Sequence, residues 1–260
     1  MFLKTGLISS MLTYNMFICV LALIIIPSKV GASETMEEKR ILKEFSLHLD
    51  ASRIIYSDNS VGETISVINK HDYPILVQSS VMKENQQDLA PFVMTPPLFR
   101  LDPHQSSRIR IVRVGGEFPS DRETLQWVCV KGIPPKNEDK WAEGWYSKNK
   151  SNIALEVNFS VNSCIKLMFR PDSIKGYPEN VADKIKWKRF GNLLKGENPT
   201  PFYMNISEIN IGGVELNDNH YIAPFSSYEY KIPFGVVGKI KWRVKNDYGG
   251  SSRMFESDYE

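Results

Sequence analysis

The stretch IALEVNFSVNSCIKLMFRP, residues 153–171, decides the fold class. In its first half, apolar residues occupy every second position, at Ile153, Leu155, Val157, Phe159 and Val161. In an extended chain these five side chains lie on one face. This period of two residues predicts a β-strand from Ile153 to Phe169. A strand of this length is either a core strand or an exposed apolar edge, and an exposed edge invites strand addition by another chain.

The same period of two extends through most of the chain. It predicts further strands at residues 45–49, 54–56, 64–69, 75–82, 107–114, 125–130, 184–190, 202–211, 228–232 and 239–244. Pro, Gly, Asn and Asp fill the gaps as turn residues, and no segment repeats apolar residues with helical spacing. The chain is therefore predicted to be mostly β.

The predicted strands divide into two blocks. About seven of them lie between residues 40 and 171, which suits one immunoglobulin-like sandwich, and a smaller set follows Pro171. We therefore predict an all-β protein with two immunoglobulin-like β-sandwich domains, residues 33–171 and 172–260, in an L-shaped arrangement with a cleft between them. A polar connection, residues 131–152, does not fit an ordinary sandwich, since loops of that length are usually functional or disordered.

The charge of the chain is balanced. It has 260 residues, with 32 Lys+Arg against 30 Asp+Glu, and is 42% hydrophobic and 24% charged, which argues against a disordered or polytopic membrane protein. Residues 1–32 contain Lys4 and Lys29 and no acidic residue, so the remainder is neutral. A neutral body has no bulk attraction to nucleic acid, and no nucleic-acid partner is expected.

Residues 1–32 are predicted to be a cleaved signal peptide. An unbroken apolar run extends from Phe17 to Ile26, and Val30-Gly31-Ala32 supplies small residues before the expected cleavage site. A membrane-spanning helix needs about twenty apolar residues, so the run is short for an anchor, although an uncleaved anchor remains the alternative. Export is therefore expected.

Cleavage would leave two cysteines, Cys129 and Cys164. A pair of cysteines in an exported chain indicates a disulfide, and two buried free thiols are the alternative. Two cysteines and four scattered histidines supply no metal-ligand set at a useful spacing. No Gly-rich phosphate loop follows a predicted strand, so neither a metal nor another cofactor is expected.

Several stretches together resemble the periplasmic chaperones of the chaperone–usher pathway. The stretches occur in order between about residues 41 and 255. They are residues 52–56 (SRIIY), 73–79 (YPILVQS), 91–101 (PFVMTPPLFRL), 118–125 (FPSDRETL), 132–135 (GIPP), 164–171 (CIKLMFRP), 198–202 (NPTPF) and 246–250 (NDYGG). Single pieces would be weak signals, but their order along the chain is specific.

The resemblance implies a function. Such a protein is a periplasmic chaperone that binds, folds and caps fimbrial or capsule-like subunits by donor-strand complementation, a known form of strand addition. It delivers the subunits to an outer-membrane usher. The long connection at residues 131–152 and the paired cysteines are similar to the long-loop subclass, which is associated with thin fibres or capsules. Self-association of the free chaperone is left open.

The resemblance also implies roles for individual residues. Arg53 and Lys166 match the cations that bind the terminal carboxylate of the subunit. The donor residues that enter the subunit's groove match Ile153, Leu155, Val157, Phe159 and Val161, with Phe45, Leu47 and Leu49 expected to add to the same surface. Glu123, Arg170 and Asp247 match an interdomain ion network. By strict alternation Lys166 lies opposite the donors, so we expect a bulge, a twist or the passage into the cleft to reconcile the two positions.

Other classes of protein compete with this interpretation. The chain could be a secreted two-domain structural or adhesive subunit of a fibre, although fibre subunits usually carry one incomplete sandwich. A receptor fragment is a second alternative, with sequons at Asn149, Asn158 and Asn205. A secreted hydrolase is a third, but the sequence shows no nucleophile–base constellation. We therefore predict a binding protein without enzymatic activity.

Overall fold

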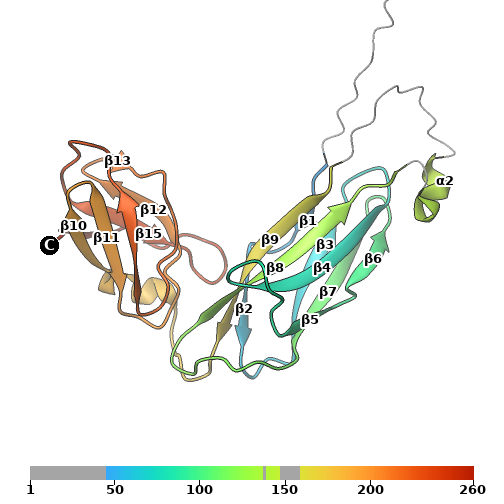
Figure 1. The fold of residues 1–260 in the computed structure, drawn as a ribbon, viewed down its shortest axis with the longest axis horizontal. Helices are drawn as coiled ribbons and strands as arrows, with labels where there is room; N and C mark the ends of the chain where they lie inside the picture. The colour runs from blue at the N-terminus through green and yellow to red at the C-terminus, as the bar shows by residue number, and fades with distance from the viewer. Residues whose placement is uncertain (1–44, 137–138, 147–158) are drawn as a thin grey trace, which may run out of the picture. The chain divides into compact units, whose positions relative to one another are not determined.

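The computed structural model describes residues 45–136, 139–146 and 159–260. Within these ranges the regular secondary structure is mainly β-strand, and the strands belong to four sheets (Figure 1). Strands β1 to β9 make up two of the sheets and strands β10 to β16 the other two. The predicted all-β fold with two sandwich domains is confirmed, while the exact boundary near Pro171 stays a prediction. The predicted signal peptide, residues 1–32, lies outside the described residues.

The first sandwich contains a four-stranded and a five-stranded sheet. The four-stranded sheet runs in the order β1 (His48–Leu49), β3 (Glu63–Ile68), β7 (Ser106–Arg113) and β5 (Phe92–Thr95). The five-stranded sheet runs in the order β2 (Arg53–Ser57), β9 (Val161–Arg170), β8 (Thr124–Ile133), β4 (Ile75–Lys83) and β6 (Leu98–Leu101). Strands β2 and β9 are parallel, and the other neighbours are antiparallel.

The second sandwich contains a three-stranded and a four-stranded sheet. The three-stranded sheet runs in the order β10 (Lys186–Phe190), β11 (Leu193–Asn198) and β14 (Ser226–Lys231). The four-stranded sheet runs in the order β13 (Val214–Glu215), β12 (Ile206–Ile211), β15 (Ile240–Val244) and β16 (Phe255–Ser257). The core of the second sandwich includes Trp187 and Trp242, whose rings pack edge to face with their centres 5.4 Å apart.

Short helices occupy some of the connections. Within the long connection of the first sandwich lie η1 (Lys140–Ala142) and α2 (Glu143–Tyr146), and the backbone oxygen of Trp141 accepts a 2.7 Å hydrogen bond from Arg100. Between β9 and β10 in the sequence lie η2 (Pro178–Asn180) and η3 (Ala182–Lys184), and Ala182 is part of the core of the second sandwich. Across the described ranges, no helix combines the length and the apolar character needed to cross a bilayer.

Strand β9 keeps one register along its whole described length. Its residues pair with β8 without interruption, from Val161 opposite Gly132 to Phe169 opposite Thr124. Leu167 and Phe169 point into the core of the first sandwich, so Lys166 lies on the opposite face by simple alternation. The expected bulge between the donor residues and Lys166 is therefore absent from residues 161–170.

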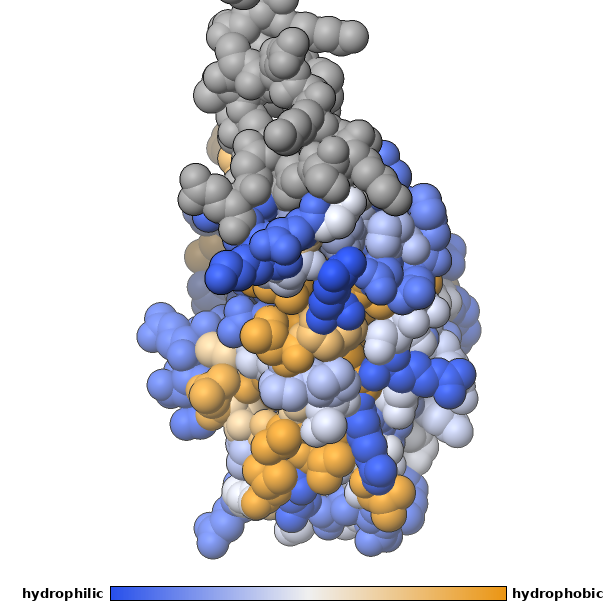
Figure 2. All heavy atoms as spheres, turned by 90° about the vertical axis from the view of Figure 1, so that its right-hand side faces the viewer, coloured by the Kyte–Doolittle hydropathy of each residue, from blue (hydrophilic) through white to orange (hydrophobic). Residues whose placement is uncertain are grey.

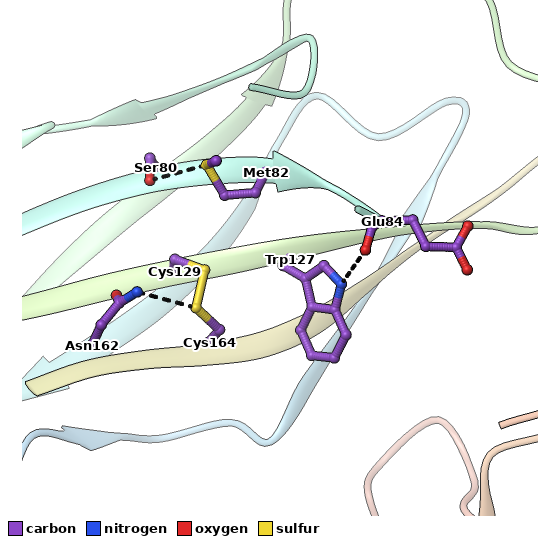
Figure 3. The surroundings of a disulfide bond; sticks show 7 residues. All are labelled: Ser80, Met82, Glu84, Trp127, Cys129, Asn162 and Cys164. Carbon is purple, nitrogen blue, oxygen red and sulfur yellow. Dashed lines mark hydrogen bonds between the residues drawn. A yellow bond between two sulfur atoms is a disulfide. The ribbon is translucent and has the colours of Figure 1, made fainter. Parts of the chain in front are cut away.

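A disulfide joins the neighbouring strands β8 and β9. Cys129 lies opposite Cys164 in the register, and the two sulfur atoms are bonded (Figure 3). The amide of Asn162 donates a 3.5 Å hydrogen bond to the Cys164 sulfur. Alternation places Cys164 and Lys166 on the same face of the sheet. The predicted bridge is confirmed.

The sequence pattern missed several strands. It predicted no strand at β5, β6 or β11, because prolines flank the first two and β11 has Gly196 at an inward position. A Cβ on Gly196 would lie 2.7 Å from the Trp187 ring, so a small residue serves the core there. The strand predicted at residues 202–211 begins only at Ile206, and a cis peptide at Thr95–Pro96 links β5 to β6. Phe202, Tyr203 and Asn205 instead contact residues of the first sandwich.

The edge strands of the first sandwich carry exposed apolar residues. Val93 of β5 is 48% exposed and Leu98 of β6 is 56% exposed. Figure 2 shows apolar side chains in small groups among hydrophilic ones on the side where Figure 1 draws β6. Scattered exposed apolar residues are normal on protein surfaces, so these residues receive no functional assignment.

Candidate functional site

Two cations lie side by side on neighbouring strands. Arg53 is the first residue of β2, and its partner in the parallel register is Lys166 of β9. Neighbouring strands lie about 4.7–4.9 Å apart, so the two side chains leave the sheet close together. Both residues are partly buried. The structure therefore brings together the two cations predicted to form the anchor.

Neutral groups surround this cation pair. The Lys166 ammonium donates a 2.5 Å hydrogen bond to the Asn205 side-chain oxygen and lies 4.6 Å from the centre of the Tyr221 ring. The Arg53 Nε is buried and has no hydrogen-bond partner in the described part of the chain. No carboxylate within the described ranges forms an ion pair with either cation. The pair is therefore uncompensated.

Burial shifts the protonation of both cations. It lowers the pKa of Lys166 to about 8, and the nearby Arg53 charge lowers it further while Glu84 raises it. Burial also lowers the pKa of Arg53, against the opposing charges of Asp247 and Glu123. Both charges are therefore partly dehydrated, and the nearest carboxylates act on them only from a distance. An incoming anion would supply a direct counter-ion through charge-assisted hydrogen bonds.

A second cluster at the junction of the sandwiches is compensated. Arg170 donates two 2.7 Å hydrogen bonds to the carboxylate of Asp247, and its Nε donates a 2.7 Å hydrogen bond to Glu123. The other Glu123 oxygen accepts a 2.8 Å hydrogen bond from the backbone N–H of Tyr203. The contacts predicted for Glu123, Arg170 and Asp247 are therefore present.

The electrostatics of this ion network differ from those of the cation pair. Burial raises the pKa of Glu123, which is 2% exposed, although the Arg170 charge and hydrogen bonds oppose the shift. Burial alone would lower the pKa of Arg170, but hydrogen bonds to Asp247 and the two carboxylate charges raise it overall. Each charge of this network therefore has its counter-charge inside the protein.

The sequence reasoning missed the neutral residues around Lys166. Asn205 comes from the loop before β12, Tyr221 from the loop before β14, and Trp127 from β8, where it pairs in register with Lys166. The Trp127 ring centre lies 5.9 Å from the Lys166 ammonium. The only available signal was the register of β8 against β9, because the two loop residues come from the other sandwich.

The exposure of the apolar side chains changes along the described part of the predicted donor strand. Phe169 and Leu167 are buried in the core, whereas Phe159, on the same alternating face, is 64% exposed. Strand β2 pairs with β9 only from Lys166 onward, so within the described chain Val161–Ile165 has a partner strand, β8, on one side only. The donor residues Ile153, Leu155 and Val157 lie outside the described residues.

The three apolar residues predicted to extend the donor surface pack inward. Phe45, Leu47 and Leu49 are partly buried against the core of the first sandwich. A Cβ on Gly132 would lie 2.7 Å from the Phe45 ring, so the glycine makes room for this side chain. In this structure the three side chains cover their own domain, and their contact with a bound subunit stays a prediction.

Two family models match consecutive parts of the chain. Residues 46–175 match the model described as pili and flagellar-assembly chaperone, PapD N-terminal domain. Residues 180–256 match the model described as pili assembly chaperone PapD, C-terminal domain. The first match contains Arg53, Lys166, Glu123 and Arg170, and the second contains Asp247.

Curated relatives cover most of the chain. The chaperone protein AggD of Escherichia coli is 59% identical over 216 residues, which span 83% of this chain and 86% of AggD. The chaperone protein caf1M of Yersinia pestis is 44% identical over 224 residues, which span 83% of this chain and 86% of caf1M.

Solved structures match the same region. The Escherichia coli chaperone DraB is 56% identical with a TM-score of 0.73, and the match covers 83% of this chain and 97% of DraB. A Salmonella enterica structure of the SafA pilin in complex with the SafB chaperone gives a match that is 46% identical with a TM-score of 0.75. That match covers 84% of this chain and 98% of the matched chain.

Proposed function

The chain belongs to the PapD-like family of pilus-assembly chaperones, and we propose that it captures a fibre subunit. It completes the subunit's sandwich with its own β9 strand and then releases the subunit to an outer-membrane usher. The periplasm is the proposed compartment, consistent with the predicted signal peptide and the disulfide. The alternative of a fibre subunit loses its support, because both matched models are of chaperone domains.

The uncompensated pair of Arg53 and Lys166 is the observation that carries the proposal. A polypeptide has one terminal carboxylate, so two cations that bind it recognise a subunit once and at a defined point. Each charge-assisted hydrogen bond to the carboxylate is worth about 1.5–3 kcal/mol. Because the cations are already partly dehydrated, a carboxylate bound there would relieve a cost that the free protein carries.

Strand β9 supplies the second part of the proposed mechanism. Its edge at Val161–Ile165 has the polar backbone groups that an added strand needs, and its apolar face becomes exposed toward Phe159. Burial of five apolar donor side chains in a subunit would contribute about 7–15 kcal/mol before the cost of ordering is subtracted. The carboxylate anchor would set the register of the added strand, since a slip of one residue would turn every side chain to the wrong face.

The proposed subclass and chemistry follow from the same features. The long connection between β8 and β9 and the disulfide between these strands support membership of the long-loop subclass. The subunits that it binds would then assemble into thin fibres or capsules of one or two subunit types. Within the described ranges, no group of three histidine, cysteine, aspartate or glutamate side chains is arranged to hold a metal. We propose a binding role without catalysis, in which subunit folding drives assembly.

The anchor is tested by removing each cation. The chain is co-expressed with a candidate fibre subunit from a neighbouring reading frame and recovered from the periplasm by a tag. Arg53→Ala and Lys166→Ala should each abolish recovery of the subunit, because the carboxylate loses a partner. Lys186→Ala, an exposed lysine of β10, is the matched control and should leave recovery unchanged. Wild-type yields from both anchor variants would refute the anchor.

The donor strand is tested on β9 itself. Phe159→Asp should weaken subunit binding by at least about tenfold, because a charge replaces an apolar side chain that the proposed complex would bury. Asn162→Asp adds the same charge to an exposed position on the other face of the strand and should have little effect. The affinity of each variant for the purified subunit is measured by titration. Equal affinities of the two variants would contradict the donor role.

A further inference from the structure

Glu84 follows strand β4 and contacts both sandwiches. One carboxylate oxygen accepts a 2.8 Å hydrogen bond from the Tyr221 hydroxyl, and the other accepts a 3.2 Å hydrogen bond from the Tyr203 hydroxyl. The Glu84 backbone oxygen accepts a 3.2 Å hydrogen bond from the Trp127 indole N–H (Figure 3). A single residue therefore holds aromatic side chains from both domains.

Two of these aromatic rings lie beside the anchor lysine. The Lys166 ammonium is 4.6 Å from the centre of the Tyr221 ring and 5.9 Å from that of Trp127. Both distances are within the range of cation–π attraction. The rings come from different sandwiches and pack against the same small cluster of Leu125, Met168 and Tyr203, and Glu84 adds a hydrogen bond to each.

We propose that Glu84 is a positioning residue for subunit capture: its carboxylate holds the Tyr221 ring so that the Lys166 ammonium stays oriented beside Arg53, while its backbone oxygen bonds to the Trp127 indole. The proposal rests on the proposed function, in which Arg53 and Lys166 bind a terminal carboxylate. The oriented group is the ammonium itself, which also donates to Asn205.

The physical reason is preorganisation. Ordering a lysine side chain costs up to about 2 kcal/mol of rotamer entropy, and a lysine that is ordered before binding does not lose this amount on binding. The Glu84 carboxylate bonds to tyrosine hydroxyls rather than to the lysine, so the ammonium remains available to an external anion. The Glu84 charge also raises the pKa of Lys166, which favours the charged form of the lysine.

The test separates recognition of a carboxylate from binding of a strand. The probe is an acetylated peptide of alternating threonine and valine, made once with a free terminal carboxylate and once as the terminal amide. The intact chain should prefer the acid form by about tenfold at neutral pH, which corresponds to one charge-assisted hydrogen bond. Glu84→Ala and Tyr221→Leu should each reduce this preference to about threefold or less, with the affinity for the amide unchanged.

Further variants distinguish the hydroxyl from the ring. Tyr221→Phe keeps the ring but removes its bond to Glu84, so its preference should lie between those of the wild type and Tyr221→Leu. Tyr228→Phe removes a tyrosine hydroxyl that bonds to Asp218 instead, and should behave as the wild type. Glu84→Gln keeps an acceptor for one tyrosine and serves if Glu84→Ala does not fold. NMR titration should give a lower pKa for Lys166 in Glu84→Gln than in the wild type.

Three outcomes decide the proposal. If Glu84→Ala and Tyr221→Leu prefer the acid peptide as strongly as the wild type does, the positioning role is overturned and the anchor stays intact. An equal loss of affinity for acid and amide also overturns it, because that pattern reports general structural damage. No preference for the acid in the wild type overturns the carboxylate anchor itself and this inference with it.

Discussion

Strand β9 carries two cations on one face, and they have opposite surroundings. Arg170 is bonded to the carboxylates of Glu123 and Asp247, whereas Lys166, four residues earlier, is bonded to the neutral amide of Asn205 and flanked by aromatic rings. Both lie where the two sandwiches meet. Arg170 therefore has its counter-charges within the protein, whereas Lys166 keeps a charge that an external anion could neutralise.

The largest expected effect comes from breaking the compensated cluster. Arg170→Ala leaves the buried Glu123 without its cation, and should lower the free energy of unfolding by about 3–5 kcal/mol. Urea denaturation measures this loss. Lys239→Ala removes one partner of an exposed ion pair with Glu256 and is the matched control, with an expected loss below about 1 kcal/mol. Similar losses in both variants would show that the Arg170 network does not hold the domains together.

A smaller effect is expected from the uncompensated pair. Arg53→Met should change the free energy of unfolding by less than about 1 kcal/mol, because the arginine has no direct counter-ion and its removal relieves repulsion with Lys166. The same urea titration applies. A loss as large as that of Arg170→Ala would mean that Arg53 is a structural cation, and the contrast between the two clusters would disappear.

A separate effect on the same pair is a pH dependence. The pKa of Lys166 is lowered to about 8 in the folded protein, below the ordinary value near 10.5. Between these values the unfolded chain holds a proton that the folded chain has released, so folding becomes more favourable as pH rises. The stability of the wild type relative to Lys166→Met should therefore increase from pH 8 to pH 10. A flat difference would show that Lys166 titrates normally.

Several parts of the fold and site could be predicted from the sequence. Alternating apolar residues are sufficient to identify strands such as β4 and β9, because burial of one face of a sheet imposes a period of two. The cysteine pair was found from an even count in an exported chain. Arg53, Lys166 and the ion network were found from the resemblance to a family, since a single charged residue carries no pattern of its own.

Other parts had no sequence signal. Strand β11 was missed because an inward position is Gly196, which makes room for the Trp187 ring. Residues 202–205 were predicted as strand, but the Tyr203 N–H bonds to Glu123 and the Asn205 side chain bonds to Lys166. Apolar periodicity does not report such contacts, because the partners are far apart in the sequence.

Local periodicity and composition were enough to predict that this protein is built of strands and that two cysteines pair, and they fix the balance of its charges. Which cations are neutralised depends on the folded arrangement of the chain. Arg170 and Lys166 have the same charge and lie on the same strand, but the loops of the second sandwich bring Asp247 to one and Asn205 with Tyr221 to the other. The energy of a charge depends on its neighbours in space, and folding alone selects those neighbours.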